Sequence, residues 1–443
     1  MSAARRSIEA LEKSFELTDE ELKEVRRAFQ EEMERGLSDE QSSLKMLPIF
    51  IDRASGRERG RFIALDLGGT NFRVLRVDLL GGGKVRIDPI GKYVIPEEAM
   101  HGTGDELFGF IARSIEQFLG DNRIAVDEKI HLGFTFSFPI DQSGIAAGTL
   151  IKWTKGFSAS GVEGADVVML LSKALRQAGL SSIEITALAN DTVGTLEAKS
   201  YEDPDCDVGI IFGTGTNACY REKISNIKKM KPAVESGEYM IINIEWGDFG
   251  TLRVTDYDCQ LDRSTNNPGR QRMEKMISGM YLGEIARLIL DRMIEDGCLF
   301  VNSSARLSAG DFETRHISLA ESDRSDDFTK IKECLEEMGL FESSYDDRVA
   351  VAAVCRIVST RAARLAAAAI SAIVTWMDPG LSRRHTIAID GSLYEKHPHF
   401  RQRIIDTLKG LHADAAGKIE LTHAKDGSGI GVAVAAAVAA STA

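Results

Sequence analysis

The sequence predicts an α/β protein made of two related halves, and three observations support this prediction. The chain has 443 residues, which is too long for a single hydrophobic core and favours two domains. From residue 61 onward, strand-like and helix-like patterns alternate, as expected for a mixed or parallel sheet covered by helices. A glycine-rich hairpin motif occurs twice, at 62–77 and at 207–220. We therefore expect two halves that bind one phosphate chain between them.

The first hairpin has the features of an anion-binding turn. Residues 62–65 form an apolar run that suits a buried strand, and 72–77 suit the returning strand. Gly68 and Gly69 lack a Cβ, so the N–H groups of the turn can converge on an anion. Asp66 ends the first strand and places a carboxylate where a divalent cation would bridge it to that anion.

Residues 1–60 are predicted to form charged helices that pack on a domain. Residues 18–21 have the sequence of a capping box at a helix start. Residues 46–51 are a short apolar segment, and a polar linker follows at 52–61. The apolar residues after the capping box recur on one helical face: Leu22, Val25, Phe29 and Met33.

The rest of the chain is divided into elements by its hydrophobic periodicity and its turn residues. Besides the strands of the two hairpins, we expect strands at 130–136, 183–189, 239–245 and 386–389. We expect helices at 104–119, at 166–178, from 192, from Arg270 toward Met293, and at 430–440. The region 303–347 is polar and acidic, which favours surface loops and short helices.

The longest apolar stretch, 349–377, is expected to be a buried alanine-rich helix. Arg356, Arg361 and Arg364 interrupt it, and its charge-free part is shorter than the roughly 20 residues that span a bilayer. No apolar signal-peptide segment is visible near residue 1. We therefore expect a cytoplasmic protein without a membrane partner.

The composition excludes several classes of function. A net charge of −13 disfavours a nucleic-acid partner, which would require a basic face. The six cysteines are scattered without a C-x-x-C pair, which favours reduced thiols over disulfides or a zinc site. The eight histidines have no triad-like context and are expected at the surface.

Asp191 is the candidate general base. It follows a predicted strand, beside Asn190, at a position where side chains point into a site rather than a core. An Asp at a helix start is also a common N-cap, so the dipeptide alone leaves both interpretations open. A base here would accept the proton of an attacking hydroxyl while a phosphoryl group is held in line.

Polar residues at other strand ends and loops suit a polyol substrate. Each hydroxyl of a polyol both donates and accepts a hydrogen bond, and carboxylates, amides and a lysine can pair with it. Taken singly, each of these residues also fits a turn, a helix surface or a solvated side chain. The set consists of Ser137, Thr154, Lys155, Asn190, Asn217, Glu245 and Glu274.

Four glycine turns form a second group of candidates, for phosphate binding. A Gly-Ser-Gly next to a helix leaves the first N–H groups of that helix free for an anion. The chain has no G-x-x-x-x-G-K-[ST], strict G-x-G-x-x-G or G-x-S-x-G motif, which disfavours P-loop, Rossmann and α/β-hydrolase proteins. The turns are Gly68-Gly69-Thr70, Gly213-Thr214-Gly215, Gly391-Ser392 and Gly427-Ser428-Gly429.

Over nearly its whole length the chain resembles the eukaryotic-type hexokinases and glucokinases, as a single catalytic unit. The resemblance rests on many ordered motifs with family-like spacing, which makes it specific. These motifs lie at 65–74, 132–139, 153–157, 190–195, 213–220, 243–247, 267–269, 274–284, 390–394 and 426–429.

The resemblance implies an actin-like ATPase (ribonuclease H-like) fold with a cleft between a small and a large domain. It divides the chain into a helical segment 1–60 that packs on the large domain, a small domain 61–190 completed by helix 428–443, and a large domain 191–427. It further implies an ATP-dependent kinase that uses Mg²⁺ and phosphorylates the 6-hydroxyl of glucose, with fructose and mannose as further candidates. The protein would be a monomer or a homodimer.

The resemblance also assigns roles by position. Asp191 would be the catalytic base, and Lys155 and Arg73 would complete the catalytic set. The hexose would be held by Ser137, Phe138, Thr154, Lys155, Asn190, Asp191, Asn217, Glu245 and Glu274. The nucleotide would be held by Asp66, Gly68, Gly69, Thr70, Asn71, Arg73, Thr214, Gly215, Gly279, Thr314, Ser318, Gly391, Ser392 and Ser428, with Asp66 binding the metal through water.

The chain departs from the family pattern at Ala165, Asp248 and Ile430, positions that bear on sugar affinity and nucleotide contacts. Two alternatives stay open, and a third is disfavoured. An actin- or chaperone-like ATPase would hydrolyse ATP without sugar, and a catalytically silent sensor would bind sugar without turnover. A repressor-type bacterial sugar kinase would require a cysteine-histidine zinc cluster, which the sequence lacks.

Overall fold

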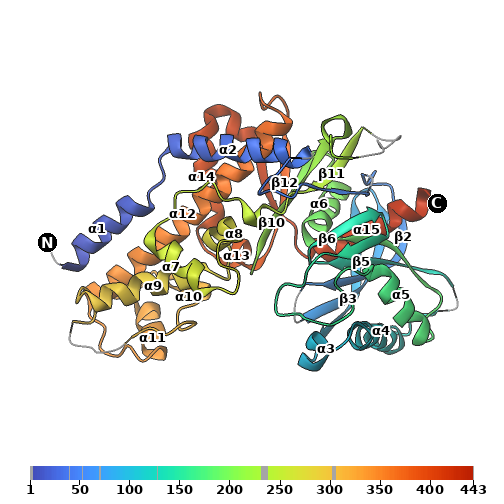
Figure 1. Cartoon of the computed structure of the whole chain (residues 1–443), viewed down its shortest axis with the longest axis horizontal. Coiled ribbons are helices and arrows are strands. Elements are labelled where there is room, and N and C mark those ends of the chain that lie inside the picture. The colour runs from blue at the N-terminus through green and yellow to red at the C-terminus, as the bar shows by residue number, and fades with distance from the viewer. Residues whose placement is uncertain are drawn as a thin grey trace.

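The computed structural model describes residues 3–38, 40–51, 53–68, 71–126, 128–230, 238–301 and 306–442, and Figure 1 shows helices covering two large sheets. The strands are β1 (Leu47–Ile49), β2 (Arg59–Leu67), β3 (Asn71–Gly81), β4 (Lys84–Val94), β5 (Ile130–Phe136), β6 (Ile140–Gly144), β7 (Ala147–Leu150), β8 (Ile183–Ala189), β9 (Cys206–Phe212), β10 (Thr216–Lys223), β11 (Tyr239–Asn243), β12 (His385–Asp390) and β13 (Ile419–His423). The helices are α1 (Ala3–Phe15), α2 (Asp19–Leu37), α3 (Glu97–His101), α4 (Gly104–Asp121), α5 (Val167–Gln177), α6 (Asp191–Glu202), α7 (Asp256–Ser264), α8 (Arg272–Ile277), α9 (Leu282–Glu295), α10 (Thr314–Ser322), α11 (Thr329–Glu337), α12 (Tyr345–Met377), α13 (Ser392–Lys396), α14 (Phe400–His412) and α15 (Gly427–Thr442). Short 3₁₀ helices lie at Ile224–Asn226, Trp246–Asp248 and Ala413–Lys418.

The two large sheets have the same plan. In one, β2, β3 and β4 form an antiparallel meander, and β5 and β8 continue the sheet parallel to β2, in the order β4-β3-β2-β5-β8. In the other, β9, β10 and β11 form the meander, β12 and β13 run parallel to β9, and β1 adds an edge strand to β11. This duplication confirms the predicted two-domain, actin-like fold. The precise domain boundaries stay a prediction.

Helices α6 and α15 cross at two glycines, although more than 220 residues separate them in the sequence (Figure 1). A Cβ built on Gly431 would lie 1.7 Å from the carbonyl oxygen of Gly194, so only glycine permits this approach. Beyond the crossing, the buried alanines and valines of α15 pack on β2, β5 and β8. The helix therefore covers a sheet that is formed by residues 59–189.

Helix α12 is the buried helix that its alanine-rich sequence predicts. By length and composition it could cross a membrane, but 89% of its most apolar stretch is buried inside the protein. It continues beyond the predicted stretch at its start, and α1 and α2 pack along it. The capping box at Thr18 and the buried face of α2 are as predicted.

A buried ion pair fixes α12 to α7 and to the end of α1. The guanidinium of Arg361 donates two parallel hydrogen bonds of 2.7 Å to the carboxylate of Asp258. Their side chains are only 2% and 6% exposed, respectively. The Arg361 guanidinium also lies 4.3 Å from the centre of the Phe15 ring. Burial raises the pKa of Asp258, but the charge and hydrogen bonds of Arg361 outweigh burial and lower it below its usual value.

The prediction of one helix from Arg270 toward Met293 is wrong, because the helix is broken into α8 and α9. The break lies at residues 278–281, where the chain meets the glycine turn of the second hairpin. The N–H groups of Gly279 and Met280 donate to the carbonyl oxygens of Gly213 (2.8 Å) and Thr214 (3.0 Å). These backbone bonds replace the helical bonds that a continuous helix would make.

Strands β4, β6 and β7, helices α7 and α14 and strand β13 were not expected from the pattern. Strand β4 alternates between exposed and half-exposed residues and contains Pro89 and Gly91, so it does not read as a buried strand. Helix α15 starts at Gly427 rather than Ile430. The Gly-Ser-Gly sequence is therefore the first turn of the helix, and not a loop in front of it.

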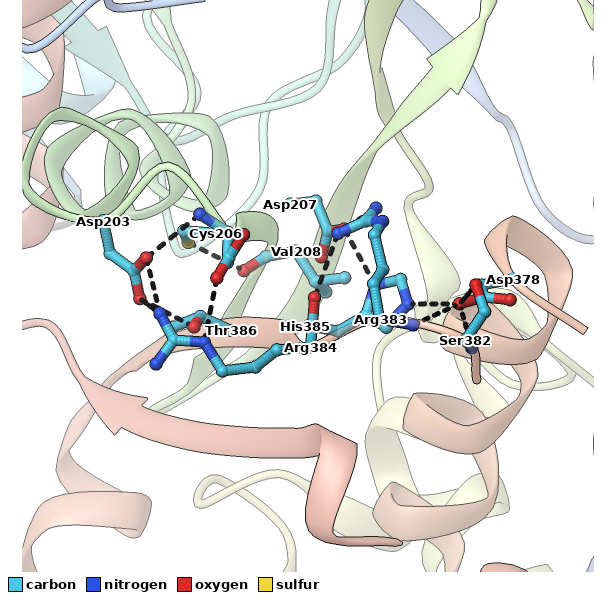
Figure 2. Close-up of polar contacts among 11 residues, drawn as sticks. Asp203, Cys206, Asp207, Val208, Asp378, Ser382, Arg383, Arg384, His385 and Thr386 are labelled. Carbon is cyan, nitrogen blue, oxygen red and sulfur yellow. Dashed lines mark hydrogen bonds and ion pairs between the residues drawn. The ribbon is translucent and has the colours of Figure 1, made fainter. Parts of the chain in front are cut away.

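The expectation that the histidines are exposed is wrong for His316, His385 and His397, which are buried. Figure 2 shows His385 between two carboxylates, with Nδ1 2.8 Å from Asp207 and Nε2 3.3 Å from Asp378. Burial raises the pKa of Asp378, but hydrogen bonds from His385 and from neighbouring groups lower it to about 2. This cluster joins the starts of β9 and β12 to the loop after α12.

Candidate active site

Asn217 and Glu245 lie together where β10 begins and β11 ends. Asn217 Nδ2 donates to Asn243 Oδ1 (2.8 Å) and to Glu245 Oε1 (2.9 Å). Asn243 Nδ2 donates to the same Glu245 oxygen at 3.0 Å. The backbone of Glu245 is left-handed, with φ of 54°, and its N–H donates to Asn217 Oδ1 at 3.0 Å. Two amides thus fix the Glu245 carboxylate through one of its oxygens.

Glu274 comes from α8 and lies against the turn between β9 and β10. Its Oε2 accepts the N–H of Thr216 at 3.1 Å. A Cβ built on Gly215 would lie 2.9 Å from this oxygen, and a Cβ on Gly247 would lie 3.3 Å from the Cβ of Glu274. Glycine at both positions therefore leaves the room that the Glu274 side chain occupies.

The hydrogen bonds at the start of α6 exclude the N-cap interpretation of Asp191, and its role as a base stays a prediction. The N-cap is Asn190, whose Oδ1 accepts the Val193 N–H (3.0 Å) and the Thr192 hydroxyl (2.8 Å). Asp191 is the first residue of the helix, and among the described residues its Oδ1 accepts a local bond from the Thr192 N–H (3.0 Å). Asp191 is therefore not the cap.

The loop after β7 brings a cation toward this region. Lys155 has a left-handed backbone, and its Nζ donates to the carbonyl oxygen of Ser137 at 2.7 Å. The same Nζ lies 5.5 Å from the centre of the Phe138 ring. Phe138 itself is buried in a cluster of aromatic rings, and the lysine lies against this cluster. Thr154 is exposed on the same loop.

The hydroxyl of Ser137 is an unusual feature of this region. Its Oγ is buried and has no hydrogen-bond partner among the described residues. A Cβ built on Gly68 would lie 3.9 Å from it, so it faces the turn of the first hairpin. Buried hydroxyls are nearly always hydrogen-bonded in folded proteins. Ser137 is therefore suited to pair with a ligand.

Charges from both halves act on the same two carboxyl groups. Burial raises the pKa of Asp191; Lys155 lowers it, and Asp66 and Glu245 raise it further. Burial likewise raises the pKa of Glu274; Glu245 adds to this, and Lys155 opposes it. The predicted base and the predicted sugar-binding carboxylates therefore form one electrostatic unit around one lysine.

Asp66 and Arg73 face each other across the first hairpin, as directly paired residues of β2 and β3. Arg73 donates to Asp66 Oδ2 from Nε (3.0 Å) and Nη2 (2.5 Å), and from Nη1 to Asp426 (2.5 Å). The hydroxyl of Ser428 also donates to Asp66, at 2.9 Å. Burial lowers the pKa of Arg73, but Asp66 and Asp426 outweigh burial and raise it. The hairpin and the start of α15 thus form one ionic cluster.

A pocket of about 950 Å³ lies next to the second hairpin. Its wall combines the Gly213–Gly215 turn with α10 and α13, and the hydroxyl of Thr314 accepts the Gly283 N–H at 2.9 Å. The turn therefore connects this pocket with Glu274. Five residues predicted for the nucleotide line it: Thr214, Gly279, Thr314, Ser318 and Ser392.

The remaining predicted nucleotide residues are distributed between these groups. Gly391 packs against the turn, since a Cβ there would lie 2.4 Å from the carbonyl oxygen of Phe212. Gly68 and Asn71 flank the turn of the first hairpin. Gly69 and Thr70 lie outside the described residues.

Several residues of the site were not predicted. Lys45, in the segment before β1, places Nζ 3.8 Å from Glu245 Oε2. Asp426 and Asn243 bind Arg73 and Glu245 directly. Gln271 lies against Gly247, where a Cβ would meet its Oε1 at 2.0 Å. Asp426, Asn243 and Gln271 lie within or beside quoted motifs, but Lys45 has no signal in the sequence.

Comparison with known proteins places the whole chain in one family. Family models described as hexokinase match residues 7–201 and 207–438. Hexokinase-2 of Rattus norvegicus is 44% identical over 440 residues, which are 96% of this chain and 47% of that protein. Hexokinase HKDC1 of Homo sapiens is 43% identical and covers 99% of this chain and 48% of that protein. The chain thus spans about half the length of the curated relatives it matches.

Solved structures give the same result. A hexokinase from Schistosoma mansoni complexed with glucose has a TM-score of 0.88 and 38% identity, covering 98% of this chain and 99% of that chain. Another hexokinase has a TM-score of 0.83 and 30% identity, with the same coverage. A ROK family glucokinase from Streptomyces griseus, with glucose and AMPPNP, has a TM-score of 0.50 and 16% identity and covers 85% of this chain and 98% of that chain. That last likeness concerns the fold alone.

Proposed function

The chain belongs to the hexokinase family, and from this premise we propose that it transfers the γ-phosphoryl group of ATP to the 6-hydroxyl of glucose or a related hexose. The observation that carries this proposal is that Asn217 and Asn243 hold Glu245, and that Glu274 lies on the adjoining Gly213–Gly215 turn. Asp191 and Lys155 belong to the same electrostatic unit through the direction in which their charges act. The Gly213–Gly215 turn joins that unit to the pocket of about 950 Å³. Polyol-binding groups and a nucleotide-sized pocket therefore share one wall.

In this proposal Asp191 accepts the proton of the sugar hydroxyl as that oxygen attacks the γ-phosphorus. The oxygen–phosphorus bond forms in line with the bond that breaks to ADP, and the proton passes to the Asp191 carboxylate. Glu245, Asn217, Glu274 and the Ser137 hydroxyl hold the other sugar hydroxyls and fix the orientation of the attacking one. Closure of the two halves around the sugar would exclude water, which otherwise competes as the acceptor.

The residues around Asp66 suit a magnesium ion that is held mainly by the nucleotide. The described residues contain no group of three or more histidines, cysteines or acidic side chains that could hold a metal. Magnesium in kinases keeps several waters and is bound through one or two carboxylates and the phosphates. Asp66 would supply that carboxylate, and Arg73 holds it in place. The ion would offset negative charge on the transferring phosphates.

The experiment that tests the function is a coupled ADP-release assay with the full chain. Glucose, fructose and mannose are compared with a sugar-free blank, each with MgATP. We expect ADP release only with a hexose. Equal release in the blank would identify an ATPase, and glucose binding without ADP release would identify a silent sensor.

The pH dependence of the reaction should report the environment of Asp191. Because burial, Asp66 and Glu245 raise the pKa of Asp191 despite Lys155, its proton is lost at a higher pH than that of an ordinary Asp, about 3.9. Lowering the pH protonates the base and removes activity. We expect log kcat/KM for glucose to fall with a slope of one on the acid side, with a midpoint above pH ~3.9. A midpoint at or below that value contradicts the assignment.

Removal of the unpaired hydroxyl of Ser137 should weaken sugar binding without weakening the fold. A neutral hydrogen bond contributes about 0.5–1.5 kcal/mol, so Ser137→Ala should lower kcat/KM for glucose about 2- to 12-fold. The thermal midpoint should stay unchanged, because the hydroxyl has no partner among the described residues. Ser160→Ala, at an exposed serine bonded to Gly102, is the matched control. An unchanged kcat/KM would remove Ser137 from the site.

A further inference from the structure

Asp248 follows Glu245 by three residues and reaches from the 3₁₀ turn Trp246–Asp248 to the start of α8. Its Oδ1 accepts the backbone N–H of Gln271 at 2.5 Å. Its Oδ2 lies 3.6 Å from Arg270 Nη1, but the Arg270 side chain is 75% exposed. An exposed ion pair contributes little, whereas a short bond from a carboxylate to a backbone N–H is among the stronger hydrogen bonds. The contact with Gln271 is therefore the one that matters.

Gln271 requires such a partner because its backbone is left-handed. It precedes α8 with φ of 54° and ψ of 43°, and its own side chain makes no capping hydrogen bond. This conformation is disfavoured for residues with a Cβ. Helix α8 has only six residues, too few to hold its own first turn. The Asp248 carboxylate thus supplies an external support for the residue at which the helix begins.

Glu274 lies within one helical turn of Gln271, the residue that Asp248 holds. Glu274 is the third residue of α8, and the carbonyl oxygen of Gln271 accepts the Lys275 N–H at 2.9 Å. The side chains of Gln271 and Glu274 both lie against Gly247. A Cβ built on Gly247 would lie 2.0 Å from Gln271 Oε1 and 3.3 Å from the Cβ of Glu274. A change in the backbone of Gln271 would therefore move Glu274 away from its bond with Thr216.

We propose that Asp248 is a positioning residue for sugar binding, which holds Gln271 and thereby fixes Glu274 against the Gly213–Gly215 turn. The inference rests on the proposed function, since it assigns Glu274 to the hexose. It also gives a role to a residue at which the chain departs from the family pattern. In addition, the negative charge of Asp248 contributes to the raised pKa of Glu274, after burial and the charge of Glu245.

The test measures glucose binding to the full chain through tryptophan fluorescence, without nucleotide. Trp246 is a suitable reporter, because it is buried beside the site and its Nε1 donates to Thr216 at 3.0 Å. We expect Asp248→Ala to raise the Kd and KM for glucose about tenfold, with kcat within about twofold and KM for ATP unchanged. Asp248→Asn retains an acceptor for the Gln271 N–H and should stay within about threefold of the wild type. Arg270→Ala should leave all constants unchanged.

The outcomes separate this inference from the proposed function. A wild-type chain that binds no glucose overturns both. A wild type that binds glucose, with an unchanged Kd in Asp248→Ala, overturns the inference alone. The inference is also overturned if Asp248→Asn raises the glucose Kd as much as Asp248→Ala does. In that case the charge of Asp248, and not its hydrogen bond to the backbone, would determine the affinity. If Asp248→Ala does not fold, Asp248→Ser, whose side chain is too short to reach Gln271, carries the same expectation.

Discussion

Replacement of Asp191 by alanine is expected to lower kcat for hexose phosphorylation by about 10²–10⁴-fold, the range that one general base contributes. Without the carboxylate, the proton of the attacking hydroxyl has no acceptor beside it. Glucose binding should persist, because Asn217 and Glu245 keep their hydrogen bond and Glu274 keeps its bond with Thr216. The measurement is kcat in the coupled ADP assay, together with the glucose Kd from tryptophan fluorescence.

Asp191→Asn sharpens this test. The amide keeps the shape of the side chain and can still accept the Thr192 N–H, but it cannot take up a proton near neutral pH. Both variants should therefore lose turnover to a similar extent. Any residual activity should no longer fall on the acid side with the midpoint of the wild type. Near-normal kcat in either variant would rule out Asp191 as the base.

Removal of Arg361 should strongly destabilise the fold at a position away from the site. Arg361→Met leaves the Asp258 carboxylate buried without its partner, which costs about 3–5 kcal/mol in comparable pairs. It also removes the guanidinium from the Phe15 ring, and so loosens α1 from α12. We expect a much lower denaturant concentration at the midpoint of unfolding, measured by circular dichroism.

Arg364→Ala is the matched control, one turn further along the same helix. Arg364 pairs with Asp19, but these side chains are 27% and 51% exposed, so the loss should stay below about 1 kcal/mol.

The pH dependence of the unfolding free energy gives a second check. The lowered pKa of Asp258 stabilises the wild type above the ordinary Asp pKa, and this contribution is lost as the pH falls below it. The difference in unfolding free energy between the wild type and Arg361→Met should therefore be smaller in acid than at neutral pH. Equal losses of unfolding free energy in Arg361→Met and Arg364→Ala would contradict the argument.

Local sequence patterns predicted those elements whose ends are determined locally. Strand β8 has the predicted bounds, because an alternating apolar run is enclosed by polar residues on both sides. The capping box at Thr18 and the two hairpins likewise depend on neighbours in sequence. The duplicated sheet plan followed from the repeat of the hairpin.

Contacts between distant segments account for the elements that were not predicted. The break between α8 and α9 is made by Gly213 and Thr214, which lie more than 60 residues away from it. No breaker other than Gly279 marks that position in the sequence. His385 is buried because Asp207, 178 residues before it, provides a carboxylate. The hydrophobic periodicity of the sequence does not show which distant residues will become partners.

In the candidate site, too, local features were predicted and contacts between distant segments were not. The resemblance supplied residue identities and their roles, which remain proposals, but not the partner of each side chain. That Asn190 caps α6 and leaves Asp191 available became clear only from their hydrogen bonds. Lys45 and Asp248 act on Glu245 and Gln271 across loops, so the structure was required to find them.

The position of α15 on β2, β5 and β8 has a consequence for synthesis in the cell. Roughly 240 residues lie between Ala189, the end of β8, and Gly427, the start of α15. At about 5–20 residues per second, the ribosome needs roughly 10–50 seconds to deliver the helix that covers the finished strands. During that time the nascent chain carries an uncovered apolar sheet face, which is a surface that chaperones bind. A premature stop before residue 427 would therefore yield an aggregation-prone chain, rather than a shorter protein with one intact half.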